Sequence, residues 1–251
     1  MRAVLFDDPP AIDRAQDLVY EAWEAPSAKK RRELAEGALR ISPDCADAYN
    51  ILADLTTSPA EARALYAKAI AAGARALGEE FFEENVGHFW GLLETRPYMR
   101  ARAGLAELLW DAGEREAAVD HYRELLRLNP GDNQGIRQIL VGRLLETGRD
   151  TDAVALLKTY KGGGSAWMVY ARALAAFRAE GDSATARKQL AAARKANGHV
   201  PAYLLGRKKL PRSTPDFHRF GDDSEAICFM AEGAAAWHGT LGAVEWLAAT
   251  E

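Results

Sequence analysis

One pattern recurs along the chain at nearly constant spacing. A small residue is followed four positions later by a larger apolar one, as in Ala118 and Tyr122, and the pattern returns from Ala153 and Ala186 at intervals of 35 and 33 residues. Such spacing places both residues on one face of a helix, where the small one permits close approach of a second helix and the larger one fills the gap. The pattern therefore predicts stacked helical hairpins.

The turns between the helices carry a matching signal. Gly113, Gly148 and Gly181 each stand five residues before the small residue, where a tight turn needs a residue with free φ. The clearest copy of the unit runs from Tyr98 to Asp132 and closes with Asn-Pro-Gly-Asp. An earlier copy contains Ala62 and Tyr66 at the same spacing.

A helix pair about every 34 residues, with this small–large pattern and a closing proline, resembles the tetratricopeptide repeat. The resemblance covers roughly residues 28–198. It implies an all-α fold, a right-handed α-α solenoid of tetratricopeptide-like helical hairpins, in which the first helix of each pair lines the concave side. Residues 1–198 are thus expected to form the repeat region, with an insertion near 73–97, and residues 199–251 a C-terminal helical cap.

Helical spacing of apolar residues predicts helices at 12–23, 28–41 and 47–55 in the first part of the chain. The insertion contains the aromatic pair Phe89 and Trp90 in an irregular turn, which either plugs a helix junction or forms a binding patch.

The C-terminal part carries a second resemblance. The segments HVPAYLLG at 199–206 and GDDSEAICF at 221–229, followed by Ala236 and Trp237, resemble the end of proteins in the suppressor-of-tumorigenicity family. Eukaryotic members of that family are membrane-associated and of unsettled biochemical function, and the resemblance transfers no catalytic residue. We expect a short helix at 200–206, a loop at 208–220 and two final helices.

Composition narrows the functional class. The net charge is −4, with about −8 in residues 1–125 and about +4 in residues 126–251. Nucleic-acid binding draws on clustered positive charge, so a mildly acidic chain argues against it. The N-terminal residues lack a signal peptide and no uncharged stretch approaches the ~18 residues of a membrane span, so no membrane partner and a cytoplasmic location are expected.

Motifs of catalysis and metal binding are missing. The five histidines show no metal-ligand spacing, and no phosphate-binding or nucleophile-elbow motif occurs. Cys45 and Cys228 are expected to be buried apolar groups. We therefore predict a non-enzymatic protein without cofactor or metal.

The predicted function is protein–protein interaction, as a scaffold that holds a peptide or protein segment in the concave groove. Arginines and amides there suit a peptide carboxylate or an acidic segment. Joint Arg100→Ala and Arg137→Ala substitution is expected to abolish binding with little effect on melting temperature. The predicted partner-binding residues are Asn50, Arg96, Arg100, Glu107, Asn133, Gln134, Arg137 and Arg172.

Two alternatives remain. One is a small-ligand or enzymatic site at the 85–100 insertion, which a deep polar pocket at His88, Glu94 and Arg96 would favour. The other is a self-associating structural unit, such as a homodimer, that uses its acidic first half and basic second half.

Overall fold

The computed structural model describes residues 9–250. Over this range the secondary structure is helical and no strand occurs, which confirms the predicted all-α class. Internal packing divides the chain into two compact units, with the boundary between Gln134 and Gly135. The boundary predicted at residue 198 separates the repeat region from the C-terminal cap, whereas the boundary at 134 separates compact units. The predicted boundary therefore stays a prediction.

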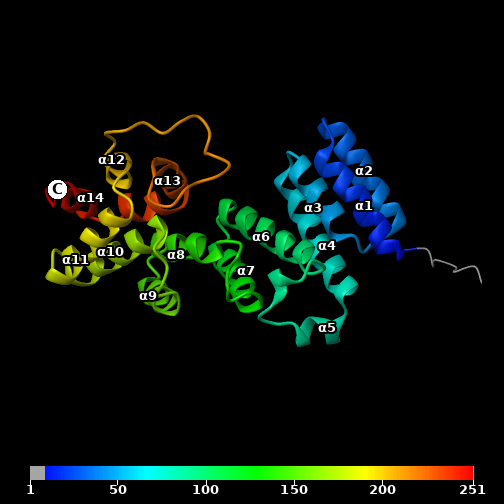
Figure 1. Cartoon of the computed structure of the whole chain (residues 1–251), viewed down its shortest axis with the longest axis horizontal. Coiled ribbons are helices and arrows are strands. Elements are labelled where there is room, and N and C mark those ends of the chain that lie inside the picture. The colour runs from blue at the N-terminus through cyan, green and yellow to red at the C-terminus, as the bar shows by residue number, and fades with distance from the viewer. Residues whose placement is uncertain (1–8, 251) are drawn as a thin grey trace, which may run out of the picture. The chain divides into compact units, whose positions relative to one another are not determined.

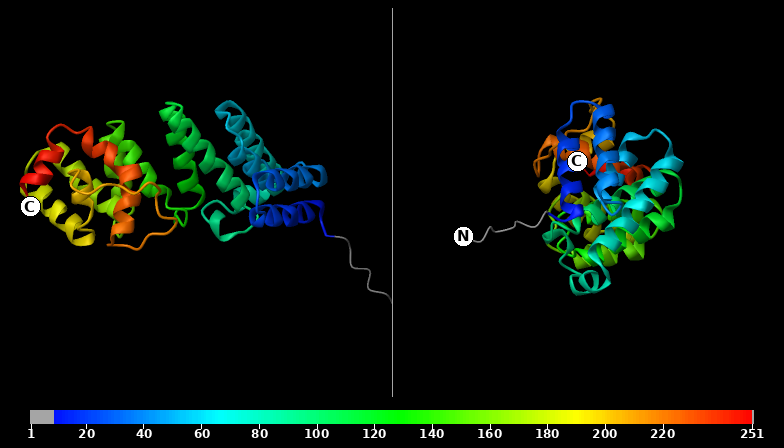
Figure 2. Two further views of the ribbon diagram at one scale, coloured as in Figure 1. Left: turned by 90° about the horizontal axis from the view of Figure 1, so that it is seen from above. Right: turned by 90° about the vertical axis from the view of Figure 1, so that its right-hand side faces the viewer.

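The first unit consists of three antiparallel helix pairs and an insertion (Figure 1). The successive first helices α1, α3 and α6 also contact one another, α1 with α3 and α3 with α6. Figure 2 shows the same pairing from two further directions. The pairs are α1 (Ala11–Glu24) with α2 (Ala28–Ile41), α3 (Ala46–Leu55) with α4 (Pro59–Leu77), and α6 (Arg96–Asp111) with α7 (Arg115–Leu128).

Local capping fixes where several of these helices begin. The Ser27 hydroxyl accepts a hydrogen bond from the Lys30 N–H at 3.2 Å, and the Ser58 hydroxyl accepts one from the Glu61 N–H at 3.4 Å. Each satisfies one of the backbone donors left open at a helix start. Helix α2 has the predicted bounds, and α1 and α3 lie within one residue of theirs.

Alanine dominates the contacts between helices of the first unit. Ala69 and Ala72 of α4 pack with Ala46 and Ala101 of the two flanking first helices. Side chains this small let backbones come close, which is the role predicted for the small residue of the repeat. Ala118, Ala153 and Ala186 are each fully buried, and the preceding turn glycines have φ between 63° and 82°.

The insertion is shorter than predicted. Helix α4 continues past Gly73 to Leu77, and only then do the short helix α5 (Glu79–Glu84) and the 3₁₀ turn Phe89–Gly91 follow. Gly73 lies within this helix, where a Cβ would be 3.0 Å from the Tyr98 Cβ, so the close contact with α6 favours glycine. Phe89 is fully buried edge-on against Phe82 and Tyr98, at ring distances of 4.7 and 6.3 Å, so it plugs the helix junction.

The second unit contains two further helix pairs and the C-terminal segment. The pairs are α8 (Ile136–Glu146) with α9 (Asp150–Thr159), and α10 (Ala166–Glu180) with α11 (Ala184–Ala196). The C-terminal segment comprises α12 (Val200–Leu204), a long loop, α13 (Asp223–His238) and α14 (Ala243–Ala249), close to the predicted elements.

Helix α13 packs on the first helices of both pairs, α8 and α10. The crossing with α8 is close at Gly142, where a Cβ would lie 3.3 Å from the carbonyl carbon of Glu232 and nearer still to its oxygen. A side chain larger than hydrogen would therefore push the helices apart. Within this unit, the face of α8 and α10 that would otherwise line a groove is covered by the chain itself.

Buried polar contacts hold the C-terminal segment in place. The Glu225 carboxylate is 1 % exposed and accepts hydrogen bonds from the N–H groups of Ala166 and Gly221, both at 2.8 Å, and from the Asn197 amide at 2.9 Å. Arg178 of α10 donates to the carbonyl oxygens of Leu145 and Ala236. These contacts join α8, α10, α11 and α13, so the predicted packing of the C-terminal segment on the repeats is built into this unit.

Candidate functional site

The first unit contains an open cleft between its first helices α1, α3 and α6. It consists of two adjoining hollows of about 500 and 270 Å³ that share Trp23, Asp47 and Arg100. We call the two hollows together the first-unit cleft. Its further lining residues are Ile12, Asp13, Gln16, Tyr20, Asp44, Ala46, Asn50, Ile51, Asp54, Tyr66, Gly73, Ala76, Leu77, Leu93, Glu94, Arg96, Pro97, Gly104 and Glu107.

A buried ion pair forms the floor of the cleft. Asp47 is 1 % exposed and receives both Nε and Nη2 of Arg100, the former at 2.9 Å from Oδ1. The Arg100 guanidinium also lies 5.2 Å from the centre of the Trp23 ring. This geometry is bidentate and stacked, which fixes the side chain in place. Arg100 therefore lines the cleft as predicted, but its hydrogen-bonding capacity is directed at Asp47.

Asn50 completes the same floor. Its amide donates to Asp47 Oδ1 at 3.1 Å and to the Pro97 carbonyl at 3.0 Å, so it joins α3 to the start of α6. The side-chain oxygen of Asn50 is buried and makes no hydrogen bond among the described residues. A buried amide oxygen without a donor is costly, so the floor of the cleft contains one unsatisfied polar atom.

Carboxylates outnumber cations around the cleft. Within the described range, the carboxylates of Asp13, Glu94 and Glu107 make no hydrogen bond or ion pair, and all three residues are exposed. The two lining cations, Arg96 and Arg100, face six lining carboxylates, and of these only Asp47 pairs with a lining arginine. The cleft is therefore acidic. The six carboxylates belong to Asp13, Asp44, Asp47, Asp54, Glu94 and Glu107.

Tyr66 borders the smaller hollow. Its hydroxyl donates to Asp54 at 2.6 Å. Burial raises the pKa of Tyr66, and the hydrogen bond and charge of Asp54 with the nearby Glu107 raise it further. The ring lies against Gly104, where a Cβ would come within 2.6 Å of the Tyr66 Cζ. Glycine at 104 thus makes room for the ring that forms this wall.

The 85–100 insertion supplies one rim of the larger hollow. Arg96 lies with its guanidinium 5.3 Å from the centre of the Trp90 ring and donates from Nε to the Trp90 carbonyl at 3.1 Å. Glu94 and Arg96 line the hollow, whereas His88 is exposed and does not. The polar pocket of His88, Glu94 and Arg96 that would favour a ligand site in the insertion is therefore not assembled.

The remaining predicted residues lie elsewhere. Asn133 is exposed and Gln134 half-buried at the end of the first unit, outside the cleft. Arg137 of the second unit lies 5.1 Å from the centre of the Tyr160 ring. Arg172 donates to the carbonyl oxygens of Gly163 and Tyr160 at 2.8 and 2.9 Å, so it ties the glycine-rich 161–165 turn to α10.

Sequence reasoning missed the contribution of α1. Tyr20 and Trp23 are 53 % and 42 % exposed, their rings are 5.6 Å apart, and both line the cleft. Exposed aromatics on an otherwise charged helix face were the available signal, since large apolar side chains gather at binding surfaces.

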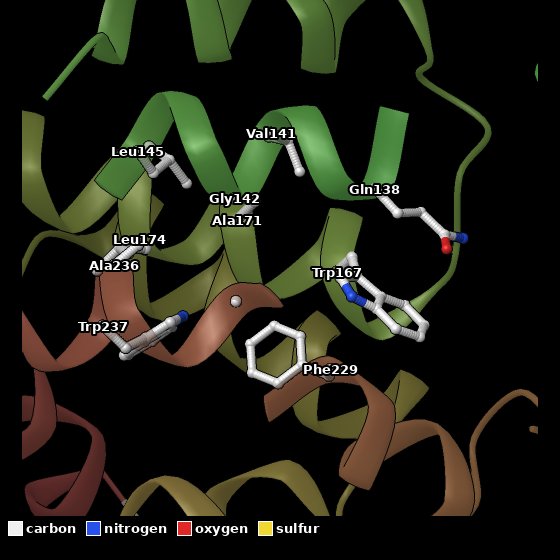
Figure 3. A pocket seen from close by; sticks show the side chains of 11 residues that line it. Gln138, Val141, Gly142, Leu145, Trp167, Ala171, Leu174, Phe229, Ala236 and Trp237 are labelled. Atoms are coloured by element: carbon white, nitrogen blue, oxygen red, sulfur yellow. The ribbon is translucent and has the colours of Figure 1, made fainter. Parts of the chain in front are cut away.

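The second unit offers a much smaller cavity. It lies between α8, α10 and α13, with Phe229 and Trp237 of α13 facing Val141 and Leu145 of α8 (Figure 3). Its volume is about 10 Å³, close to the least that a single water requires. This cavity is a packing gap under α13 and has no room for a metabolite.

Other chemistry finds little support in the described part of the chain. Burial raises the pKa of the Cys45 thiol to about 11, and also raises the pKa of Cys228, so neither is an activated nucleophile. Within residues 9–250, no group of three or more His, Cys, Asp or Glu side chains is placed to hold a metal ion. The described helices include none with the length and apolar character needed to span a bilayer.

Comparison with known proteins supports the fold. No family model matches the sequence, and no curated protein matches it. Among solved structures, the chain is similar to the crystal structure of YrrB, described as a TPR protein with an unusual peptide-binding site. The match has a TM-score of 0.51 and 18 % sequence identity, and it covers 75 % of this chain and 86 % of that one. The fold is thus an α-α solenoid of tetratricopeptide-like helical hairpins.

Proposed function

We propose that the protein is a non-enzymatic interaction module, and that its first-unit cleft holds a cationic segment of a partner peptide or protein. The observation that carries the proposal is the open cleft on the first helices α1, α3 and α6, which is lined by unpaired carboxylates beside exposed aromatics. In the second unit the equivalent face lies under α13.

The charge of the segment follows from the electrostatics of the cleft. The guanidinium of Arg100 is already paired with Asp47. An acidic ligand would therefore be repelled by the carboxylates of Asp13, Glu94 and Glu107. A lysine or arginine instead gains attraction from these carboxylates, and a guanidinium also stacks well on tyrosine or tryptophan. The preference for an acidic segment expected from the sequence is therefore reversed in our proposal.

The shape favours a peptide over a compact metabolite. The hollows continue into one another across three helices, and their lining mixes apolar residues such as Ile12, Leu77 and Leu93 with polar ones. An extended segment meets such a surface with alternating side chains. The likeness to a TPR protein with a peptide-binding site supports the same class of ligand.

The test uses an array of short peptides that differ in charge, with binding measured by fluorescence anisotropy on the purified chain. Peptides with spaced lysine or arginine and aromatic residues should bind, and added salt should weaken them because exposed charges are screened. Glu94→Gln with Glu107→Gln should lower affinity about tenfold, since two exposed ion pairs contribute about 1 kcal/mol or somewhat more in total.

The matched control is Glu33→Gln with Glu36→Gln, which removes two exposed carboxylates from α2 outside the cleft. It keeps the same net charge as the cleft variant. Equal loss of binding in both variants, or binding of acidic peptides alone, would reject the proposed site.

A further inference from the structure

The loop between α12 and α13 is the most exposed apolar and cationic segment of the second unit. Residues 205–222 contain no helix, and in Figure 1 the segment forms a wide arc between α12 and α13. Leu210, Phe217 and Phe220 are 51 %, 90 % and 69 % exposed. Irregular loops of this length are uncommon in compact proteins and usually serve a function. Exposed phenylalanines in this segment indicate contact with another surface.

The loop is fixed at its ends and free in its middle. Lys208 pairs with Asp223 at 2.5 Å, and the Arg219 N–H donates to the Ser224 hydroxyl at 3.0 Å. Residues 209–214, with the sequence KLPRST, make no hydrogen bond within the described range. Lys209 and Arg212 are exposed there without an ion pair among these residues. The middle is thus presented as an open, cationic segment with a bend at Arg212 and Ser213.

We propose that this loop of one copy of the chain binds in the first-unit cleft of a second copy. This inference rests on the proposed function of the cleft and names its occupant. The charges are complementary: Lys209 and Arg212 in the middle of the loop make no ion pair among the described residues, and neither do the carboxylates of Asp13, Glu94 and Glu107 in the cleft.

The dimensions also agree. Six extended residues span about 20 Å, and two steps between neighbouring packed helices, from α1 through α3 to α6, also span about 20 Å. Pro211 disfavours helix in the residue before it, and no residue from 209 to 214 is helical, so this segment can extend on binding. Leu210 or Phe217 then meets the apolar and aromatic lining that includes Tyr20, Trp23 and Leu93.

Oligomeric state is the first readout. Light scattering coupled to gel filtration, and sedimentation equilibrium, should give a mass that rises with concentration above the 27.4 kDa of one chain and falls again with added salt. A constant monomer mass up to high concentration at low salt would overturn the inference.

A charge-reversal pair makes the test specific. One variant carries Lys209→Glu with Arg212→Glu in the loop, and the other carries Glu94→Lys with Glu107→Lys in the cleft. Each alone should dissociate at least tenfold more readily than the native chain. Their mixture should associate again, because each loop then meets a cleft of opposite charge. Failure of the mixture to associate would overturn the proposal, and circular dichroism checks that both variants fold.

A synthetic peptide of residues 206–221 separates this inference from the proposed function. The peptide should bind the full chain at least tenfold more tightly than a scrambled peptide of the same composition. It should also dissociate the oligomer by competing for the cleft. If array peptides bind the cleft but the 206–221 peptide does no better than its scramble, the occupant is wrong and the function of the cleft stands. If no cationic peptide binds, both fail.

Discussion

Gly142→Ala tests the close crossing of α8 and α13 that covers the first-helix face of the second unit. In an isolated helix this change stabilises by about 1 kcal/mol, because alanine is the better helix former. Here the new methyl group would meet the backbone carbonyl of Glu232, with its carbon at 3.3 Å and its oxygen well within contact distance. Because the obstacle is backbone, α13 must move as a body.

The magnitude follows from two opposed terms. Overpacking of this kind costs about 1–3 kcal/mol, and a shift of about 1 Å forfeits up to half of the dispersion energy of the contacts it opens. Those contacts include Trp237 and Phe229, each 1 % exposed. After subtracting the gain in helix propensity, we expect Gly142→Ala to lower the free energy of unfolding by up to about 2 kcal/mol.

The assay is urea denaturation followed by tryptophan fluorescence, with Gly37→Ala as the control. Gly37 lies in α2, where a Cβ would meet the Leu18 Cδ1 methyl at 3.3 Å and the Arg40 Nη2 atom at 3.6 Å, both ends of side chains that can move aside. The control should therefore be neutral or stabilised by up to about 1 kcal/mol. Equal stabilisation in both variants would refute the reasoning, because it would mean that α13 does not approach α8 closely.

Four other perturbations have defined outcomes. Ala118→Leu should destabilise by about 1–3 kcal/mol through overpacking, whereas Ala64→Leu, at an exposed position of α4, should change stability by less than about 0.5 kcal/mol; both are measured by denaturant unfolding. Arg100→Ala should lower stability by about 1–3 kcal/mol, because it leaves the buried Asp47 carboxylate without its cation; an unchanged melting temperature would contradict this. Glu225→Gln should lower the free energy of unfolding by about 1–3 kcal/mol, because the new amide nitrogen would face one of the three hydrogen-bond donors. Thermal unfolding measures this loss, and glutamine has the same shape as glutamate, so a cavity cannot be its cause. Hydrogen bonds from Arg187 and then Trp246 lower the pKa of Asp182 from 3.8 to about 2, so its stabilisation is complete above pH about 4 and is lost as the pH falls towards 2; Asp182→Asn should flatten the acid limb of an unfolding curve followed by fluorescence.

Helix pairing was predictable from sequence because it depends on local periodicity. The small residues Ala118, Ala153 and Ala186 recur at the repeat spacing and predict close helix contacts. Gly113 and Gly148 indicate turns, because the positive φ needed there is adopted easily by glycine alone. These signals reside within about ten residues of the feature that they predict. They can consequently be recognised without knowledge of the tertiary structure.

The role of the arginines depends on partners far away in sequence. Arg100 pairs with Asp47, which lies 53 positions earlier, and no local pattern links the two. Arg172 serves the carbonyl groups of the preceding turn, which sequence alone does not distinguish from an exposed ligand-binding position. The joint Arg100→Ala and Arg137→Ala test expected from the sequence is thus wrong in one respect, since removing Arg100 should destabilise the fold.

Glycines within helices were the overlooked signal. Gly73 was interpreted as the start of an insertion, although it allows α4 to continue against Tyr98. Gly142 lies in the middle of α8 and marks the place where α13 crosses. An isolated glycine inside a helical pattern usually has a packing reason, but the sequence does not say which segment packs there.

The most direct test of the central claim is where a bound cationic peptide contacts the chain. The six tryptophans can be replaced by 5-fluorotryptophan, so that each gives its own ¹⁹F NMR signal. Trp23 lines the first-unit cleft, whereas Trp167 and Trp237 are buried in the second unit. We expect peptide titration to shift the Trp23 signal, with a smaller shift at Trp90 beside Arg96, and to leave Trp167 and Trp237 unchanged. Binding that leaves Trp23 unmoved, or that shifts Trp167 and Trp237 instead, would contradict the account.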